Sequence, residues 1–316
     1  MFQIFLYLQF LPLLFNFPGS PSQSRINDKL GTQPAKSPAD SVDLIAPGAK
    51  LIKISDQFSF TEGPVADKKG NVYFTDQPND NIWKYDTKGR LMLFMRGAGR
   101  SNGLAMDRKG NLISCADANN EIIRIDSKKS MEQIVGKVNG YRLNGPNDLW
   151  IDASGGIYFT DPLYKRPYWV HAGPDIPGEN VYYYNARTKN VTLVDSTIRK
   201  PNGIIGTPDG KYLYIADIGD NKTYRFEITG KGTLANRQLF TSLGSDGLTL
   251  DEQGNLYLTG RGITVFNPSG EKISHINVPE GWTANLCFGG KNRDMLFITA
   301  SKAIYTLNMR VRGARY

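Results

Sequence analysis

Acidic and amide residues recur along this chain at positions where their side-chain oxygens could bind a metal ion. Each stands directly before a short apolar run, and the five are Glu62, Asn102, Asn147, Asn202 and Asp246. Carboxylate and amide oxygens are hard donors that select Ca²⁺, Mg²⁺ or Mn²⁺, and Zn²⁺ also accepts them. Two carboxylates would balance the charge of one divalent ion. If the fold brings these residues together, they predict one cation site, for which Ca²⁺ is the first candidate.

A simpler interpretation is that these residues only form turns. Asn-Gly and Asp-Gly pairs are typical of tight hairpins, and the segment RLNGPND at residues 142–148 is rich in turn formers. This explanation suits any one asparagine, but it does not suit Glu62, which precedes Gly-Pro and is not a turn former. The shared pattern around all five residues favours the cation site.

The five residues belong to a repeat that continues through most of the chain. Each unit has a polar residue, an apolar strand, a turn of the D-x-x-G-N kind and a second apolar strand. Six such units begin at Glu62, Ser101, Pro146, Pro201, Ser245 and Thr283. A period of about 40–50 residues with several short strands per unit is typical of a β-propeller. The sequence therefore predicts an all-β, six-bladed β-propeller, and the lack of sustained helical periodicity disfavours TIM-barrel and Rossmann folds.

A propeller would place the polar residues at one end of its central channel. The first strand of each blade lines that channel, and a single blade cannot bury both of its faces, so the ring must be one domain. We predict that the strand AKLIKIS, residues 49–55, pairs with AIYTLNM, residues 303–309, and closes the ring. The predicted organisation is a signal peptide or N-terminal anchor at 1–17, a linker at 18–48, the propeller at 49–309 and a basic tail at 310–316.

The composition argues against a nucleic-acid partner. The chain has 316 residues, a net charge of +8 and a pI of about 9.3, but its basic residues are scattered among acidic ones. A nucleic-acid binder needs a clustered basic footprint, and the one dense group lies in the tail. With 40% apolar residues the chain can form a large core. We expect a monomer or weak oligomer that binds a small-molecule substrate.

An apolar run, FQIFLYLQFLPLLFNF, opens the chain and is followed by PGSPSQS. This pattern is typical of a secretory signal or an N-terminal membrane anchor, although the positively charged start of a signal peptide is missing. We therefore expect export to the periplasm or out of the cell, with membrane insertion only if the segment is retained. The alternative is a cytoplasmic protein with a disordered leader.

Other catalytic patterns have little support in the sequence. Residues 99–103, GRSNG, match the G-x-S-x-G nucleophile elbow, but the elbow needs a helix after it, and a strand-like run follows here. His171 and His275 are the two histidines, too few for a histidine zinc site. The loop LYKRPYW at residues 163–169 combines cations with aromatic rings. Its Arg166 is a candidate contact for an anionic or sugar-like substrate. The equally weighted alternative is that this loop has only a structural role and is packed by its aromatic rings.

Several of these motifs occur together in one known family. The segments EGPVADKKGNVYFTD, RLNGPNDLW, KPNGIIGTPDGKYLYIAD and SDGLTLDEQGNLYLTG resemble the SMP-30/gluconolactonase/luciferin-regenerating-enzyme-like family over about residues 55–309. The resemblance implies a six-bladed propeller with a divalent cation in its channel and hydrolysis of sugar lactones by many members. It implies that Glu62, Asn202 and Asp246 bind the metal and that Asp246 also transfers protons. It further implies that Asn147 lies at the substrate and close to the metal.

The same resemblance carries weaker implications for substrate recognition. It suggests Asn102 and Asn144 as further substrate contacts. Some animal members have a sugar-contacting arginine two residues before the asparagine of the third blade, and Gly145 stands at that place here. The substrate preference of those members therefore does not transfer directly.

The chemistry that this set of residues would support is opening of a lactone, a cyclic ester. A metal polarises the carbonyl oxygen and acidifies water, while a neighbouring carboxylate, here Asp246, accepts a proton and returns it to the leaving alkoxide. We therefore predict a divalent-metal-dependent lactone hydrolase of the gluconolactonase kind. The alternative is a non-catalytic propeller that binds a ligand or protein and has a structural metal ion.

Overall fold

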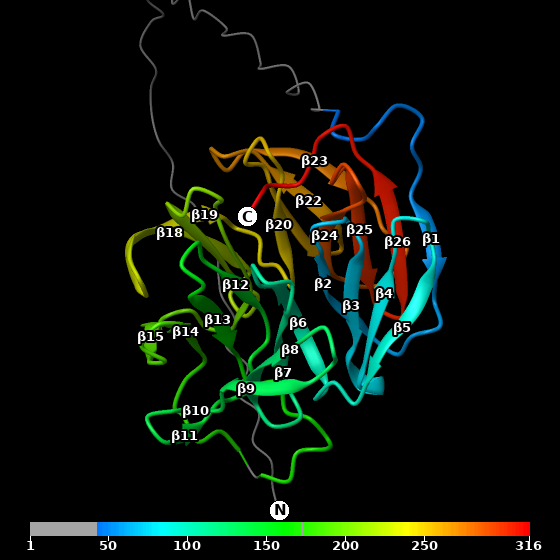
Figure 1. Cartoon of the computed structure of the whole chain (residues 1–316). Coiled ribbons are helices and arrows are strands. Elements are labelled where there is room, and N and C mark those ends of the chain that lie inside the picture. Colours follow the sequence, from blue (N-terminus) through cyan, green and yellow to red (C-terminus); the bar gives the residue numbers. More distant parts are fainter. Residues whose placement is uncertain (1–42, 172) are drawn as a thin grey trace, which may run out of the picture. The chain divides into compact units, whose positions relative to one another are not determined.

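Short antiparallel strands make up almost the whole of the protein. The computed structural model describes residues 43–171 and 173–316. Six four-stranded sheets follow one another around a central channel (Figure 1), which confirms the six-bladed β-propeller. The predicted signal or anchor at 1–17 and most of the linker at 18–48 lie outside the described residues. Among the described residues no helix is long and apolar enough to cross a membrane.

The first three blades follow the chain from its innermost to its outermost strand. Blade 1 contains β2 (Thr61–Ala66), β3 (Val72–Asp76), β4 (Asn81–Tyr85) and β5 (Leu91–Arg96). Blade 2 contains β6 (Ser101–Met106), β7 (Leu112–Ala116), β8 (Glu121–Ile125) and β9 (Met131–Val135). Blade 3 contains β12 (Leu149–Ile151), β13 (Ile157–Asp161), β14 (Asn180–Tyr184) and β15 (Val191–Asp195).

The remaining blades have the same order, except at the ring closure. Blade 4 contains β16 (Pro201–Gly206), β17 (Tyr212–Asp217), β18 (Lys222–Gly230) and β19 (Thr233–Thr241). Blade 5 contains β20 (Leu248–Leu250), β21 (Leu256–Gly260), β22 (Gly262–Phe266) and β23 (Lys272–Ile276). Blade 6 contains β24 (Thr283–Gly289), β25 (Met295–Ala300), β26 (Ala303–Asn308) and β1 (Ile52–Ser55). A small hairpin of β10 (Lys137–Val138) and β11 (Tyr141–Arg142) and the 3₁₀ turn η1 (Gln77–Asn79) complete the described elements.

An N-terminal strand closes the ring, as predicted. β1 is the outer strand of blade 6 and pairs antiparallel with β26, with Ile52 opposite Thr306. The sixth sheet is therefore made from both ends of the propeller sequence (Figure 1). This arrangement ties the last blade to the segment that leads into the first.

The D-x-x-G-N turns fold as the sequence predicts, because the aspartate bonds to its own turn. Asp67 Oδ1 accepts hydrogen bonds from the backbone N–H groups of Lys69 and Asn71, at 2.8 and 3.0 Å. Gly70 has a φ of +87°, a conformation that side chains disfavour and glycine tolerates. Each turn reverses the chain after an inner strand, so the inner strand can pair with the second strand of its blade.

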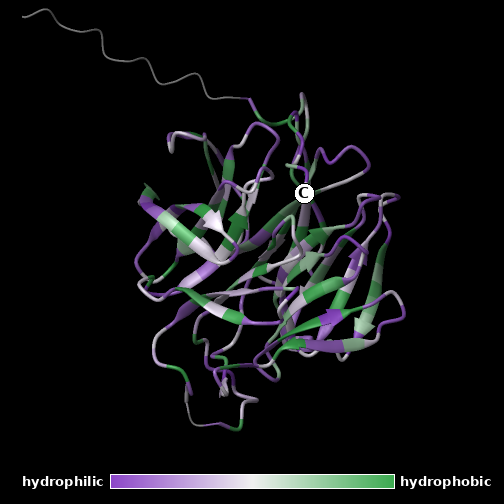
Figure 2. Ribbon diagram, turned by 60° about the vertical axis from the view of Figure 1, so that its left-hand side comes forward, coloured by the Kyte–Doolittle hydropathy of each residue, from purple (hydrophilic) through white to green (hydrophobic). Residues whose placement is uncertain are grey.

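The core lies between neighbouring blades. Large apolar side chains on the strands are fully buried, including Phe74, Phe159 and Phe297, and Phe74 contacts Phe297 across the junction of blades 1 and 6 with ring centroids 5.4 Å apart. Figure 2 shows hydrophobic segments along the strands and hydrophilic ones mainly in the turns. Burial of both faces of each sheet needs a neighbour on each side, which only a closed ring provides.

Candidate active site

All five predicted ligand residues lie where the innermost strands begin. Glu62, Asn102 and Asn202 are the second residues of β2, β6 and β16, while Asn147 and Asp246 stand two residues before β12 and β20. All five are buried, with exposed fractions between 2% and 9%. Five different blades therefore present a polar residue at the same end of the channel.

Contacts between blades link these residues into one ring. The backbone N–H of Gly103 donates to the carbonyl of Asn147 at 2.9 Å, which joins blade 2 to blade 3. Hydroxyl groups of second-strand threonines then hold the carbonyl oxygens in the next blade. The pairs are Thr75 with Asn102 at 3.0 Å, Thr160 with Asn202 at 2.7 Å, and Thr259 with Ala284 at 2.8 Å. The penultimate threonine of these second strands thus fixes the backbone behind the site.

The two predicted carboxylate ligands influence each other. Burial, together with the charges of Asp246 and Asp148, raises the pKa of Glu62 well above its usual value. Burial raises the pKa of Asp246 to about 6, while hydrogen bonds from Trp282 and Asn202 and the charge of Arg166 oppose that rise. Such mutual repulsion in a buried place costs free energy unless a cation is present.

Two further polar residues of the site were not among the ligands predicted from the repeat. Asp148 and Asn285 stand one position later than the other ligand residues, where blades 1, 2, 4 and 5 have glycine. Burial raises the pKa of Asp148 to about 7, and a hydrogen bond with Asn285 opposes the rise. Asn285 Nδ2 also donates to Glu62 Oε2 at 3.2 Å. Blade 6 has Ala284 at the position that holds a polar residue in the other blades. Its contribution to the site comes from the next residue, Asn285.

Glycines make room for these two side chains. A Cβ atom at Gly247 would lie 2.0 Å from Asn285 Cγ, and a Cβ at Gly103 would lie 2.7 Å from Asp148 Oδ1. Both distances are too short for any larger residue. Four of the six repeats have glycine at this position, and the other two have Asp148 and Asn285. A column-by-column alignment of the repeats would have identified these two residues as exceptions.

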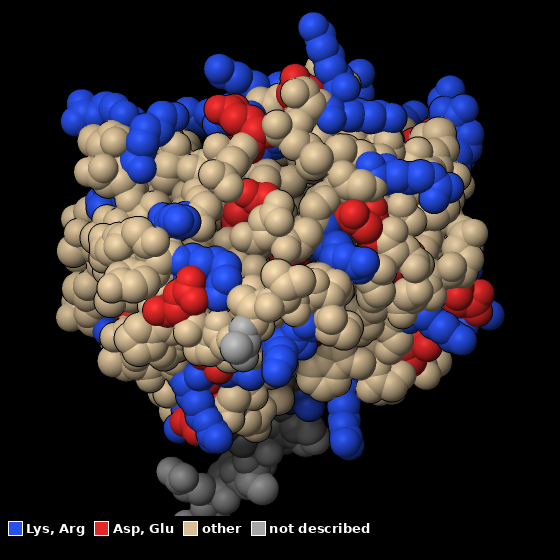
Figure 3. Space-filling view, turned by 90° about the horizontal axis from the view of Figure 1, so that it is seen from below, with Lys and Arg blue, Asp and Glu red and all other residues tan. Residues whose placement is uncertain are grey.

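A loop lies next to the site. We call residues 162–171 and 173–179, between β13 and β14, the mouth loop. Its Tyr164 hydroxyl accepts a hydrogen bond from Asn202 Nδ2 at 3.1 Å, and burial together with the charge of Asp246 raises the pKa of Tyr164. Figure 3 shows the face that carries this loop, where basic side chains are scattered singly and form no continuous patch.

Asp117 anchors the mouth loop. Its Oδ2 accepts hydrogen bonds from Arg166 Nε at 2.5 Å and from the Tyr168 hydroxyl at 3.0 Å, and its backbone carbonyl accepts one from Trp169 Nε1 at 2.7 Å. The corresponding aspartates of blades 1, 3 and 4 instead bind backbone N–H groups of their own blades. Among these equivalent aspartates, Asp117 is the one that binds side chains of the mouth loop. The Arg166 that it holds is close enough to Asp246 to interact with its charge.

The segment RLNGPND contains both supporting and site residues. Asn144 Nδ2 donates to the carbonyl oxygens of Asp161, at 3.2 Å, and Gly178, at 2.8 Å, so its amide nitrogen holds the loop, and substrate contact by Asn144 stays a prediction. A Cβ at Gly145 would lie 3.0 Å from Trp169. The mouth loop therefore occupies the space into which a side chain at position 145 would extend.

The competing motifs do not form a second active site. Ser101 of the GRSNG segment lies inside β6 and donates to the carbonyl of Ala98 at 2.6 Å, with no strand-to-helix elbow. His171 stacks on Trp169, with ring centroids 4.9 Å apart, and His275 lies on the outer strand β23. Neither histidine is positioned beside Ser101 in the described contacts.

The residues at the channel end fit a divalent cation. Carboxylates of Glu62, Asp148 and Asp246 are buried together, and Asn102 Oδ1 is buried without a hydrogen-bond partner among the described residues. Within residues 43–171 and 173–316 no group of three or more His, Cys, Asp or Glu side chains is arranged to hold an ion by itself. Amide oxygens would therefore complete the ligand set, as Ca²⁺ readily accepts.

Comparison with known proteins agrees with this architecture. Residues 60–302 match the SMP-30/Gluconolactonase/LRE-like region family. The chain belongs to this family. It is 26% identical over 290 residues to a gluconolactonase of Zymomonas mobilis subsp. mobilis, covering 82% of this chain and 81% of that protein.

Two further proteins that are similar to this chain are named a lactonase and a gluconolactonase. Lactonase drp35 of Staphylococcus haemolyticus is 28% identical over 246 residues, which cover 72% of each protein. The structure of a gluconolactonase from Xanthomonas campestris superposes with a TM-score of 0.78 and 27% identity, covering 84% of this chain and 91% of the other.

Proposed function

We propose that this protein is a divalent-metal-dependent hydrolase that opens a lactone, a sugar lactone or a related cyclic ester. The observation that carries the proposal is a buried group of carboxylates and amide oxygens at the mouth of a propeller channel. Relatives named gluconolactonase and lactonase support the reaction class. A ring of acids without a nearby histidine suits activation of water better than a serine nucleophile.

The proposed ligands of the ion are Glu62, Asn147, Asn202 and Asp246, with Ca²⁺ the first candidate. When bound, the ion would polarise the lactone carbonyl and lower the pKa of water. The protein's own part is to hold the ring of oxygens rigidly. Asn285 and the backbone N–H of Gly63 both donate to Glu62 Oε2, at 3.2 and 2.8 Å, which orients this carboxylate.

Asp246 is the proposed proton-transfer residue. Trp282 Nε1 donates to Asp246 Oδ2 at 2.6 Å, so one oxygen is held while the carboxylate keeps further acceptor capacity. Asp246 would accept a proton from the attacking water and return it to the alkoxide that leaves as the ring opens.

The mouth loop supplies the proposed substrate contacts. Arg166 and Tyr164 lie close enough to Asp246 to interact with its charge. Asn102 and Asn147 are buried where the inner strands of their blades begin. A substrate with several hydroxyl or carboxylate oxygens would satisfy these donors. Because Trp169 fills the space beside Gly145, the contacts to such a substrate differ from those of relatives with arginine there.

The test is turnover of a panel of aldonolactones after bound metal has been removed. Activity should return on addition of one or more of Ca²⁺, Mg²⁺, Mn²⁺ and Zn²⁺, and it should be absent in a Glu62→Gln, Asp246→Asn double variant. If no lactone is opened and metal raises only the melting temperature, the non-catalytic propeller with a structural ion is the correct interpretation.

A further inference from the structure

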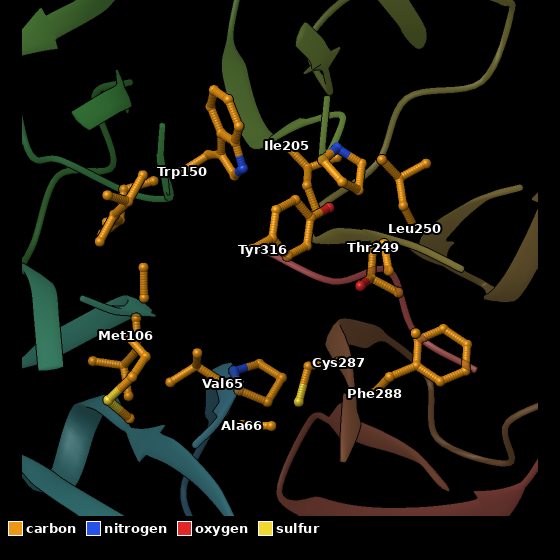
Figure 4. Close-up of a pocket in the computed structure, with 18 of the residues that line it drawn as sticks. Val65, Ala66, Met106, Trp150, Ile205, Thr249, Leu250, Cys287, Phe288 and Tyr316 are labelled. Atoms are coloured by element: carbon orange, nitrogen blue, oxygen red, sulfur yellow. The ribbon is translucent and has the colours of Figure 1, made fainter. Parts of the chain in front are cut away.

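The inner strands enclose a cavity between the blades. Its volume is about 580 Å³, and Figure 4 shows Val65, Trp150 and Leu250 in its wall, together with the ring of Tyr316 from the tail. None of the five predicted ligand residues, all of which the structure describes, is part of its lining. The partners that hold the side chains of those ligands therefore lie outside this cavity, and one of them belongs to the mouth loop.

Tyr164 of the mouth loop is bonded to the predicted ligand Asn202. Asn202 Nδ2 donates a hydrogen bond to the Tyr164 hydroxyl at 3.1 Å. Asn202 is 2% exposed, so water can do little to satisfy its amide. The mouth loop thus reaches the site through one hydroxyl group that contacts one predicted ligand.

The contacts of the Asn202 amide leave its oxygen available. An ionised carboxylate only accepts hydrogen bonds, and Asp246 accepts one from Asn202, so the amide nitrogen faces Asp246. The same nitrogen has a second hydrogen, which Tyr164 accepts. The amide oxygen, Oδ1, accepts no hydrogen bond from a described residue and is the atom that could bind an ion.

The Tyr164 ring is itself held in place by two cations. Lys200 Nζ lies 4.6 Å and the guanidinium carbon of Arg166 lies 5.8 Å from the centre of the ring, within the range of cation–π attraction. Both cations have carboxylate partners, because Arg166 pairs with Asp117 and Lys200 Nζ lies 3.7 Å from Glu179 Oε1. The hydroxyl of Tyr164 therefore has a fixed support.

We propose that Tyr164 is a positioning residue of the ion site: its hydroxyl holds the Asn202 amide so that Oδ1 stays available to the ion. This inference rests on the ion site of the proposed function, but it concerns ion binding in the absence of substrate. Residues that hold a metal ligand commonly change metal affinity by about 10–100-fold. A tyrosine that only contacted substrate would leave the ion affinity of the substrate-free protein unchanged.

The test is calorimetric titration of the metal-free, substrate-free protein with Ca²⁺. Tyr164→Phe removes the hydroxyl and keeps the ring, and the Kd for Ca²⁺ should rise by at least about tenfold. The matched control is Tyr168→Phe in the same loop. The Tyr168 hydroxyl donates to Asp117 Oδ2 at 3.0 Å and accepts from Gln77 Nε2 at 2.6 Å, and neither partner is a predicted ligand, so this variant should keep the wild-type Kd.

Melting temperatures in chelator distinguish positioning from general damage to the fold. Each variant loses the hydrogen bonds of one hydroxyl, worth about 1 kcal/mol apiece, so both should melt only slightly below the wild type. The inference is overturned if Tyr168→Phe weakens Ca²⁺ binding equally, or if Tyr164→Phe alone melts far lower.

The titration also separates this inference from the proposed function. If the wild type binds Ca²⁺ and Tyr164→Phe binds it equally tightly, Tyr164 does not position a ligand, and the proposed ion site is unaffected. If the wild type binds no Ca²⁺, the predicted ion and the role of Tyr164 are both wrong.

Discussion

Asp246 and Glu62 are both buried acids of the site, and we assign the proton transfer to Asp246. Glu62 Oε2 accepts hydrogen bonds from Gly63 and Asn285, and Asp246 accepts hydrogen bonds from Trp282 and Asn202. An amide in place of Asp246 would keep an oxygen for the ion but could not accept a proton. For Asp246→Asn we therefore expect turnover to fall by about 10²–10⁴-fold, while titration calorimetry still detects divalent-ion binding.

The control for this substitution is Asp56→Asn, because the Asp56 side chain is 60% exposed and bonds to Lys53 instead of to a residue of the site. It should leave both turnover and metal binding unchanged. Lactone turnover at the normal rate in Asp246→Asn would refute proton transfer by Asp246.

At the residue scale the sequence predicted some positions better than others. Glu62, Asn102, Asn147, Asn202 and Asp246 share a column of the repeat, and the structure places all five at one channel end. Asp148 and Asn285 lie in the next column, where glycine is usual, so a search for recurring polar residues passes over them. Contacts made by Tyr164 and Trp282 come from loops without a repeat, and spacing alone could not reveal them.

The mouth loop shows how one element depends on a single anchor. Asp117, which is 2% exposed, connects Arg166, Tyr168 and Trp169 to blade 2. Loss of its charge would leave Arg166 without its ion pair and loosen the loop over the site. For Asp117→Asn we expect KM for the lactone to rise by about tenfold, the effect of about 1.4 kcal/mol, with a smaller change in kcat.

Asp217 offers a matched control for the loop, since it is the equivalent aspartate of blade 4 and binds the N–H groups of Arg199 and Lys200. Asp217→Asn should lower the melting temperature without a selective rise in KM. Equal effects of both substitutions on KM would mean that Asp117 has only a general structural role.

The strand β1 is a second element whose contribution can be measured. Its pairing with β26 was predicted from residue order, because a ring of identical units needs its last sheet completed. Deletion of residues 49–56 would expose the edge of β26 and open the ring between blades 6 and 1. We expect the single cooperative unfolding transition to be lost in calorimetry, and an unchanged melt would contradict closure by β1.

At the scale of the whole molecule, architecture was the most predictable feature. Strand alternation and D-x-x-G-N turns act locally, so they are readable from the sequence, and the six-fold repeat then determines the ring. The cavity that Val65, Trp150 and Leu250 line was not predictable, because it arises from packing between all six blades and from the path of the tail. In the sequence the tail indicated only a short basic segment.

The buried acids make the stability of the metal-free molecule depend on pH. Burial raises the pKa of Asp148 and of Asp161 to about 7 and that of Asp246 to about 6, whereas an unfolded aspartate titrates near 3.9. The folded state therefore binds more protons than the unfolded state between these values. Since stability falls with pH wherever the folded state holds more protons, the metal-free protein should lose stability as pH rises from about 4 to about 7.

A divalent ion should oppose this loss, because it stabilises the ionised form of Asp246 and Glu62 directly. We expect the melting temperature in chelator to fall between about pH 4 and about pH 7, and the gain from added Ca²⁺ to grow over the same interval. Asp161→Asn is the control: Asp161 bonds to the N–H groups of Asn144 and Gly145, so its share of the pH dependence should be the same with and without the ion. A gain from Ca²⁺ that stays constant or shrinks with rising pH would show that the ion does not bind these carboxylates.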